Sequence, residues 1–373
     1  YTGGGCPHIL AEPMRTNEVT YSSDFSNSYF QKVRSTISTD QIISPDGTQN
    51  ADKFIEDSAS GTKLLWTQDE VISIGDVITW SVFAKKGERE WIMLRDTAAN
   101  TAYVFTAYFD LENGVVGTTS GVSSSKIEDY GGGWYRCSIT YTSNTTTAKG
   151  RLYLADSDSG ESYTGNGTSG LYIFGSQLEV GSYPTSYIPT SGSTVTRNQD
   201  IFTRDGIGSL INSTEGVLFL EYQSTEDSNL SLISISDGTD GDIVTIGRSA
   251  NSTNIYAGVR SNSGNSLYYS SSAFANTSDF IKVAVKWKVN DFAVWVNGTE
   301  VSTSLSGNAP IGLSEINFYY GNALHTFFGK VKQLQVYDTA LTDEQLLQLT
   351  GESGTDFYES YAEMASALTY TIQ

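Results

Sequence analysis

Residues 177–197 read QLEVGSYPTSYIPTSGSTVTR, and this stretch separates two long runs of strand-like sequence. On its N-terminal side, apolar and polar residues alternate over long segments with few breakers. Within it, Gly181, Pro184, Pro189 and Gly192 interrupt regular structure every few residues. A second alternating run begins at Gly216. The pattern therefore predicts the last strand of one β-sandwich, followed by an extended connector to a second sandwich.

The composition favours an all-β chain. Its 373 residues leave room for two or three domains, each with a core of its own. Charged residues make up only 17% of the chain, aromatic residues make up 12%, and no long segment has helical spacing. We therefore expect two tandem antiparallel β-sandwiches with one short C-terminal helix.

The net charge limits the partners that the chain can bind. Its formal charge is −20 at pH 7. Such an acidic surface repels phosphate backbones, so we expect no nucleic-acid partner. Anionic membrane surfaces are disfavoured for the same reason. The charge suits neutral or cationic glycans, or an anionic glycan bridged by a divalent metal ion.

Cysteine use and the absence of targeting segments suggest assembly in a reducing cytoplasm. Cys6 and Cys137 are the only cysteines, too few for a disulfide framework, and we expect both to be reduced. The chain has no signal-peptide pattern, and no apolar run approaches the length of a transmembrane helix. It begins at Tyr1, so we expect an N-terminal region to precede it.

Alternation with a period of two assigns side chains to opposite faces of the predicted strands. In the segment 78–85, ITWSVFAK, one face carries Ile78, Trp80, Val82 and Ala84. In the segment 280–289, FIKVAVKWKV, alternation with lysines predicts an inward face that carries Ile281, Val283, Val285, Trp287 and Val289.

Turn and capping signals mark the ends of elements in the second half. Asn297-Gly298 predicts a type I′ hairpin, because both central positions of that turn need positive φ. Thr342 is the expected N-cap of the short helix, and Gln345, three residues later, completes a capping box. Gly351 is expected to end the helix.

Several strings in the first half resemble the β-jelly-roll modules of phage and prophage tail proteins. RTN at 15–17 and SPDGT at 44–48 resemble the start of such a module. GWYR at 133–136 resembles the start of one of its strands, and QLEVGSYPTSYIPT at 177–190 resembles its close. Relatives commonly carry Trp where this chain has Phe174, a conservative departure. The resemblance implies a carbohydrate-binding-module-like jelly roll over residues 1–190 and a linker over 191–204.

The second half resembles a different sandwich. GKVKQLQVYDTALTDEQLLQL at 329–349 is similar to the strand and short helix that close a concanavalin A-like (laminin-G-type) domain. The resemblance implies such a domain over residues 205–351, followed by a C-terminal tail over 352–373.

Together the two resemblances imply a non-enzymatic component of a phage virion, in a tail or capsid fibre, that recognises host cell-surface polysaccharide. Its expected partners are other virion proteins, bound through the preceding N-terminal region, and two further copies of itself in a homotrimer. One alternative is a polysaccharide depolymerase, a lyase or hydrolase on the concanavalin-like fold. Another is a structural spacer or capsid decoration without a ligand.

No catalytic set is apparent in the sequence. His8 and His325 are the only histidines, and neither lies in a nucleophile motif. Hydrolases of the concanavalin-like architecture usually carry E-x-D-x-x-E on one strand, and that string is absent. Lyases on this fold usually need Gln-x-His, whereas Gln333 and Gln335 have no His between them. We therefore expect no enzymatic activity.

Two acidic loops are candidates for a structural Ca²⁺, since alternating carboxylates and Gly turns can supply its oxygen ligands. ADSDSGES contains Asp156 and Asp158, and SDGTDGDI contains Asp237, Asp240 and Asp242. The alternative for each loop is an ordinary solvated turn, because Asp and Gly favour turns.

Glycan sites commonly use Trp or Tyr faces for stacking. Trp80, Trp134, Trp287 and Trp295 lie in strong strand patterns, which indicates core positions. Residues near strand ends or loops remain as candidate carbohydrate-binding residues, with structural packing as the alternative for each: Trp66, Trp91, Tyr103, Tyr163, Tyr268 and Tyr319.

The tail 352–373 carries an apolar stripe at helical spacing, formed by Phe357, Tyr361, Met364 and Leu368. It predicts a short amphipathic helix. Docking on its own domain and packing between chains of an oligomer are both open.

Overall fold

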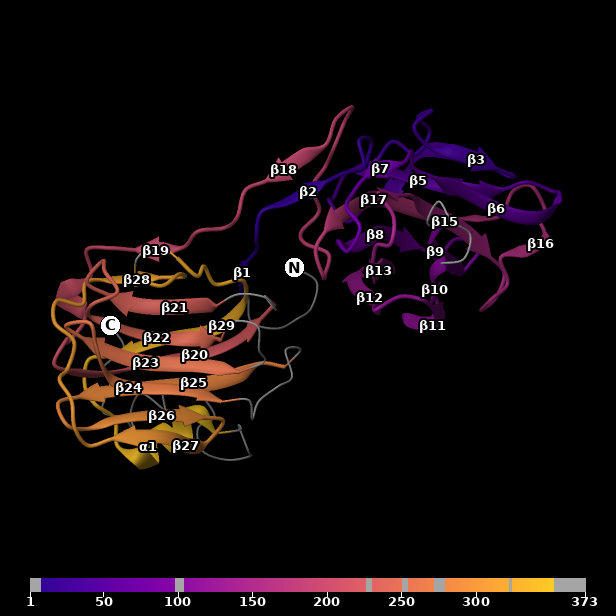
Figure 1. The fold of residues 1–373 in the computed structure, drawn as a ribbon. Coiled ribbons are helices and arrows are strands. Elements are labelled where there is room, and N and C mark those ends of the chain that lie inside the picture. The colour runs from indigo at the N-terminus through magenta and orange to yellow at the C-terminus, as the bar shows by residue number, and fades with distance from the viewer. Residues whose placement is uncertain are drawn as a thin grey trace. The chain divides into compact units, whose positions relative to one another are not determined.

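A computed structural model describes residues 8–97, 104–225, 230–249, 254–271, 279–321 and 324–351. The regular secondary structure of these residues is almost entirely antiparallel strand, with one short α-helix near the C-terminal end (Figure 1). The chain divides into two compact units, one formed by Met14–Gln199 and the other by residues that flank it on both sides. The prediction of an all-β chain with one short helix is confirmed.

Two facing sheets build the first unit. We call one the β9 sheet, and its strands in hydrogen-bonded order are β11 (Val115–Ser120), β10 (Val104–Asp110), β9 (Trp91–Thr97), β15 (Gly150–Ala155), β6 (Ser60–Trp66) and β16 (Ser162–Thr164), with β3 (Gln31–Val33) also paired to β6. We call the other the β8 sheet, and its strands are β12 (Ser124–Gly131), β13 (Trp134–Thr142), β8 (Val77–Lys85), β17 (Gly170–Val180), β5 (Gln49–Glu56) and β4 (Ser35–Ile43).

Two small ribbons complete the first unit. One pairs β7 (Glu70–Val71) with β14 (Thr147–Ala148), and the other pairs β2 (Arg15–Asn17) with β18 (Val195–Arg197).

The core of the first unit follows the predicted alternation. Ile78, Trp80, Val82 and Ala84 are all buried there, together with side chains from the β9 sheet. Trp80 Nε1 donates to Ser176 Oγ at 3.1 Å. Gly150 lies against this indole, because a Cβ at position 150 would be only 2.6 Å from Trp80 Cε2. A larger residue at position 150 would therefore displace the central Trp.

Two six-stranded sheets build the second unit. We call one the β20 sheet, and its strands in order are β1 (Ile9–Ala11), β29 (Gly329–Tyr337), β20 (Glu215–Ser224), β25 (Ile281–Lys288), β26 (Phe292–Val296) and β27 (Thr299–Ser304). We call the other the β22 sheet, and its strands are β19 (Thr203–Arg204), β28 (Glu315–Asn317), β21 (Ser231–Ser236), β22 (Ile243–Arg248), β23 (Ile255–Ser261) and β24 (Gly264–Ser271). The helical elements are η1 (Gly208–Leu210) and α1 (Asp343–Thr350).

Trp287 lies at the centre of the second core, as predicted. Its side chain is fully buried, and Nε1 donates to the Asn212 carbonyl at 3.1 Å. The inward assignment of Val289 is wrong, because β25 ends at Lys288 and the Val289 side chain is 52% exposed. The alternation applies only as far as the strand continues.

Helix α1 covers the outer face of the β20 sheet. Leu346 of the helix is buried in a cluster with Phe219 of β20 and Trp295 of β26. The predicted capping box is present, with Thr342 and Gln345 each bonding the backbone of the other. The helix contacts β25, β26 and β27 and so covers part of the outer face of this sheet, whereas it does not pack on the β22 sheet.

The predicted hairpin at residues 297–298 is also present. Asn297 and Gly298 both have positive φ, at 44° and 79°. Cys137 is a free thiol in the first core, and burial raises its pKa. Cys6 and the predicted tail helix at 352–373 lie outside the described residues.

The chain path differs from the expected tandem boundaries. Strand β1 pairs with β29 of the second unit, with Ile9 opposite Val331. The chain then forms the first unit and returns at Asp200, whose backbone N–H donates to the Glu12 carbonyl at 2.9 Å. The first unit is thus inserted into the second, whereas the sequence predicted one domain over 1–190. The expected linker 191–204 contains β18 and β19, because each finds a partner strand distant in sequence.

Candidate functional site

Two of the candidate aromatic residues lie on the outer face of the β9 sheet. Ile92 and Leu94 of β9 point into the core. Side chains alternate along the strand, so Trp91 and Met93 point outward. Trp66 of β6 lies on the same outer face. Both indoles are half-buried, and they pack on a floor of apolar side chains formed by Leu64, Met93, Tyr108, Tyr153 and Ala155.

The indole N–H groups of Trp66 and Trp91 differ from those of three buried Trp residues, whereas the Nε1 of a fourth, Trp295, is buried without a partner. Trp80 donates to Ser176, Trp134 donates to the Ile43 carbonyl at 3.1 Å, and Trp287 donates to Asn212. By contrast, neither Trp66 nor Trp91 donates a hydrogen bond to any residue that the structure describes. Both rings are partly exposed, so these donors are available to a ligand.

A row of polar side chains crosses the same face next to Trp66. Trp66 lies directly opposite Arg151 of β15, and Arg151 lies directly opposite Arg95 of β9. Arg95 in turn faces Thr106 of β10. Because opposite residues on one face are close neighbours, two guanidinium groups and an indole are adjacent here. The sequence analysis did not single out either Arg.

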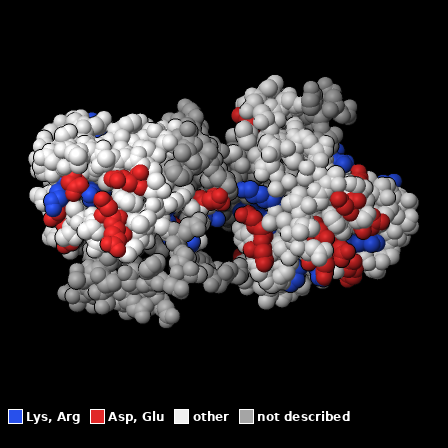
Figure 2. All heavy atoms as spheres, turned by 90° about the horizontal axis from the view of Figure 1, so that it is seen from below, with Lys and Arg blue, Asp and Glu red and all other residues white. Residues whose placement is uncertain are grey.

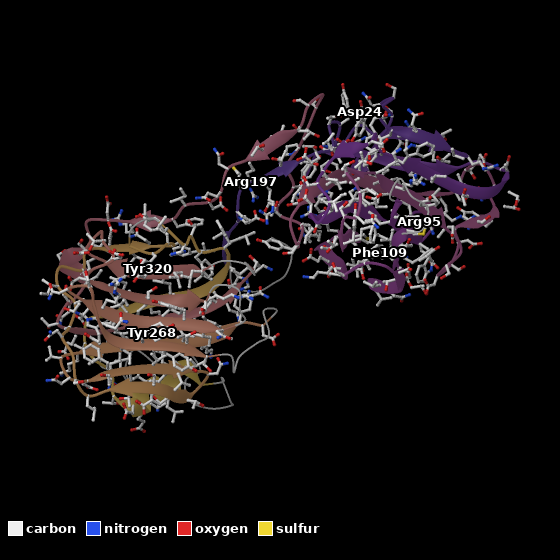
Figure 3. All side chains as sticks on the ribbon, viewed as in Figure 1. Asp24, Arg95, Phe109, Arg197, Tyr268 and Tyr320 are labelled. Atoms are coloured by element: carbon white, nitrogen blue, oxygen red, sulfur yellow. The ribbon has the colours of Figure 1, made fainter. Side chains whose placement is uncertain are left out.

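Arg95, which is labelled in Figure 3, is held in place by several contacts. Its Nε donates to Thr106 Oγ1 at 3.1 Å, and Nη2 donates to Glu161 Oε1 at 3.3 Å. Its guanidinium also lies 5.0 Å from the centre of the Tyr153 ring. The other Glu161 oxygen accepts a hydrogen bond from Tyr108. The charge of Arg95 is therefore matched within the protein.

The loop 156–161, one of the two calcium candidates, connects β15 to β16 and reaches across to β11. Asp158 accepts hydrogen bonds from the backbone N–H and the hydroxyl of Thr118, both at 2.9 Å. Gly117 permits this approach, because a Cβ there would be 2.7 Å from Asp158 Oδ1 and 2.8 Å from Trp91 Cζ3. Asp156 is exposed and accepts from Ser157 Oγ at 3.1 Å. The two carboxylates thus bond different partners.

Tyr163, another candidate, is buried in the core of the first unit. Its hydroxyl donates to Glu56 Oε2 at 2.7 Å, and its ring lies between Lys63 Nζ and Arg89 Cζ, at 4.5 and 4.8 Å from the centroid. Burial opposes ionisation of Glu56, but hydrogen bonds from Arg89, Tyr163 and Asn166 lower its pKa. Tyr103 lies outside the described residues.

A second aromatic face covers the outer side of the β22 sheet, in the second unit. Tyr256 of β23 and Tyr268 of β24 make a T-shaped contact with ring centroids 5.5 Å apart. Tyr320 lies in the loop after β28, and its hydroxyl accepts a hydrogen bond from Arg260 Nη1 at 3.0 Å. Burial raises the pKa of Tyr256 to about 12, and Tyr320 and Tyr268 add to the shift. Tyr268 is 54% exposed and is labelled with Tyr320 in Figure 3.

The remaining sequence candidates near this face have other partners. Tyr319 is half-buried, and its carbonyl accepts from Ser234 Oγ at 2.6 Å. His325 is exposed, with its ring centroid 6.3 Å from that of Tyr320. The structure thus brings Tyr268 together with Tyr256 and Tyr320, which the sequence analysis did not list as site residues. Parity within β23 and β24 would have placed Tyr256 and Tyr268 on one face.

In the second acidic loop, each carboxylate bonds to the protein. Asp237 Oδ1 accepts from the Thr239 backbone and hydroxyl, at 2.9 and 2.7 Å. Asp242 accepts from the Ile311 N–H at 2.8 Å, and Asp240 lies 3.9 Å from Arg260. Within the described ranges, no three His, Cys, Asp or Glu side chains form a group that could hold a metal ion. Calcium binding stays a prediction.

Burial raises the pKa of several carboxyl groups of the first unit, including Glu18 and Glu179, and the shift is largest in value for three others. Burial raises the pKa of Asp52 to about 6, of Glu70 to about 7 and of Asp96 to about 6. Each accepts a hydrogen bond from the protein: Asp52 from the Phe25 N–H, Glu70 from Tyr29, and Asp96 from Tyr141.

Figure 2 shows acidic side chains gathered in groups on the visible face of each unit. No helix in the described part of the chain is long and apolar enough to cross a membrane.

Comparisons with known proteins address the second unit most directly. A family model described as the concanavalin A-like lectin/glucanases superfamily, of the laminin G type, matches residues 218–347. No curated protein sequence matches the chain significantly.

Similar solved structures include three proteins of low identity. A leech intramolecular trans-sialidase complexed with 2,7-anhydro-Neu5Ac is 23% identical, with a TM-score of 0.32, over 43% of this chain and 28% of the sialidase. A heptameric SAP-like pentraxin from Limulus polyphemus is 18% identical, with a TM-score of 0.32, over 38% of this chain and 72% of the pentraxin. The LG1–3 region of the laminin α2 chain is 12% identical, with a TM-score of 0.29, over 77% of this chain and 66% of that region.

The family match covers β-strands of both sheets of the second unit and most of α1. The observed two-sheet sandwich with one short closing helix agrees with it. The second unit is therefore a concanavalin A-like domain of the laminin G type.

Proposed function

We propose that the chain is a non-enzymatic component of a phage virion fibre that recognises host cell-surface polysaccharide. The observation that carries the proposal is the tyrosine face of the β22 sheet, in the domain that matches the lectin/glucanases superfamily. Tyr268 presents an exposed ring, and Tyr256 supports it edge-on. Such rings stack on the apolar faces of sugars, while nearby hydroxyl groups form hydrogen bonds with them.

The virion role is supported by the strings of the first unit that resemble phage tail modules, above all residues 177–190. A homotrimer would strengthen weak single sites by roughly 10²–10⁴-fold through effective concentration. We therefore include a homotrimer in the proposal. We also propose calcium as a structural ion of the two acidic loops. Light scattering of the purified chain, with and without a chelator, would measure both the mass and its dependence on the ion.

Glycan-binding assays with Tyr268 variants test the proposed site. Host capsule and lipopolysaccharide fractions should bind the wild-type chain, and Tyr268→Ala should weaken binding about 2- to 10-fold, as expected for the loss of one stacked ring. Tyr268→Phe should retain most of the affinity. The matched control is Tyr130→Ala, which removes an exposed Tyr of the first unit that packs edge-on against Phe83. Binding that is unaffected by Tyr268→Ala would contradict this site.

A depolymerase is the competing function, because the matching superfamily includes glucanases by description. The proposal of no activity rests on the sequence, which lacks both the E-x-D-x-x-E string and the Gln-x-His strand. Incubation with the same polysaccharides should yield no new reducing ends and no unsaturated products. Either product would establish an enzyme, whereas polysaccharide arrays without any signal would favour a spacer or capsid decoration.

A further inference from the structure

The outer face of the β9 sheet carries two arginines, of which only Arg95 forms an ion pair within the described part of the chain. Arg95 and Arg151 lie directly opposite each other, an arrangement that costs stability for like charges. Glu161 pairs with Arg95, and Asp69 pairs with nearby Lys149 at 2.9 Å. Arg151, however, forms no hydrogen bond or ion pair with any residue in the described part of the chain.

One carboxylate that interacts electrostatically with Arg151 lies on the other side of the sheet. Asp96 is buried on the inner face, where burial raises its pKa to about 6 and the charge of Arg151 partly opposes that rise. Asp96 Oδ2 accepts hydrogen bonds from Tyr141 and from the Lys149 N–H at 3.1 Å, and Asp96 Oδ1 is buried without a hydrogen-bond partner. Arg151 Nε is also buried without a partner, so only the terminal guanidinium nitrogens of Arg151, which no described residue bonds, are available to a partner from solvent.

An aromatic platform lies next to these donors. Trp66, directly opposite Arg151, is half-buried and has a free indole N–H, as described above. A planar guanidinium binds a carboxylate through two parallel hydrogen bonds, and an indole face stacks on a sugar ring. The two side chains together match a sugar that carries a carboxylate.

We propose that the outer face of the β9 sheet is a second binding site, specific for acidic sugars. Arg151 binds the sugar carboxylate directly, without a bridging metal ion, and Trp66 stacks on the ring. The inference shares with the proposed function only the premise that the ligand is a carbohydrate, since it uses a different unit and different residues. The acidic surface elsewhere repels polyphosphate ligands. Such ligands also lack a sugar ring beside each charged group on which Trp66 could stack.

The site is large enough for an oligosaccharide. Trp91 lies four residues before Arg95 on β9, two strands away from Trp66 on β6. Standard strand geometry separates the two indoles by roughly 14 Å along the strands and 10 Å across them. The apolar floor between them includes Met93 and Tyr153. The inferred ligand is therefore a chain of several sugars whose acidic residue binds at the Trp66 end.

Calorimetry on the full chain tests the inference with charged and neutral forms of one probe. Tetragalacturonate and its methyl ester have the same rings and differ in charge, and α2,8-linked tetrasialic acid provides a second source of carboxylate. In the presence of a chelator, the wild-type chain should bind at least one acidic tetramer about 10-fold or more tightly than the methyl ester. This preference should weaken as salt is added, because exposed charges are screened.

Variants of Arg151 then locate the carboxylate. Arg151→Gln should weaken acidic binding about 10- to 100-fold, as expected for loss of a charge-assisted pair, and leave binding of the ester unchanged. Arg151→Lys should lose less. Trp66→Ala should weaken binding of acid and ester alike. The matched control is Arg204→Gln, which removes one exposed positive charge from β19 in the other unit.

The outcomes separate this site from the one in the second unit. Tyr268→Ala should leave acidic binding unchanged, so loss of acidic binding in that variant would overturn the inference and place the acid on the β22 sheet. Equal affinity for acid and ester, no affinity for either acidic tetramer, or wild-type affinity in Arg151→Gln would each overturn it. Thermal melts of all variants distinguish lost binding from lost folding.

Discussion

The outer faces of the β9 and β22 sheets carry similar residue types but differ in how their arginines are used. On the β22 sheet, Arg260 bonds Tyr320 and the Ser263 carbonyl, both at 3.0 Å, and lies near Asp240. On the β9 sheet, Arg151 has no such partner among the described residues. Of the two faces, therefore, only the β9 face has an arginine beside an aromatic ring whose terminal donors no described residue bonds. The outer face of the β22 sheet thus presents tyrosine rings, and the outer face of the β9 sheet presents the positive charge of Arg151.

The largest expected effect contrasts a Trp in a core with a Trp on a face. Trp287→Ala should lower the free energy of unfolding of the second unit by roughly 3–5 kcal/mol, because it leaves a cavity. Trp66→Ala should cost the first unit roughly 1 kcal/mol, because the half-buried ring already faces solvent on one side. Denaturant unfolding of both variants measures the difference. Equal losses would show that Trp66 is a structural residue and would weaken its assignment to a binding face.

Asp96, beneath the arginine row, should make the first unit less stable as pH rises. Burial raises its pKa in the folded state to about 6, above the ordinary 3.8, so the folded state binds more protons between these values. The free energy of unfolding should then fall, on the order of 2 kcal/mol, as pH rises from about 4 to 7. Asp96→Asn should make the fall shallower.

Asp52 and Glu70 have pKa values raised in the same direction, so their contribution to the pH dependence should remain in Asp96→Asn. Melting temperatures of both proteins across this pH range provide the measurement. An identical pH dependence in the two proteins would mean that the pKa of Asp96 is not raised in the folded state.

Deleting residues 8–13 should destabilise the second unit and spare the first, because β1 closes an edge of the β20 sheet. We expect a loss of about 1–2 kcal/mol from three paired residues and the buried side chain of Ala11. A fragment of 14–199 should fold alone. Calorimetry that resolves two transitions in the full chain would detect a shift in only one. If both transitions shifted, the insertion would not be energetically separate from its host.

The smallest expected effect changes the charge of the β9 face without touching Arg151. Glu161→Gln removes the negative charge that pairs with Arg95, so acidic tetramers should bind about 2- to 5-fold more tightly, as typical of an exposed charge pair. The matched change on the other face is Asp240→Asn, beside Arg260, which should leave acidic binding unchanged. Weaker binding in Glu161→Gln would mean that Glu161 positions the site rather than balancing its charge.

Much of the second domain was predictable because its signals are local. Alternation with lysines placed Trp287 inside, Asn297-Gly298 marked a turn, and Thr342 with Gln345 marked a helix start. Each signal needs only a few neighbouring residues. The same rule misplaced Val289 because a strand's end depends on where its partner strand stops.

The candidate sites were less predictable because their members are distant in sequence. Trp66 and Trp91 were selected by their polar surroundings, and the structure places both on one face. Tyr163 had similar surroundings but lies in the core, where Glu56, Lys63 and Arg89 contact it. A local pattern of polar neighbours cannot distinguish a surface loop from a buried ion-pair network.

The sequence by itself determined that this chain is all-β, which side of each strong strand is apolar, and where several turns and the helix begin, because backbone geometry and alternation act over a few residues. Only the tertiary structure decided that β1 joins β29 and that Arg151 lies between Trp66 and Arg95. Those neighbours depend on which strands pair and in what register. Pairing is selected by the packing of the whole sandwich, since many strands of similar composition could pair locally.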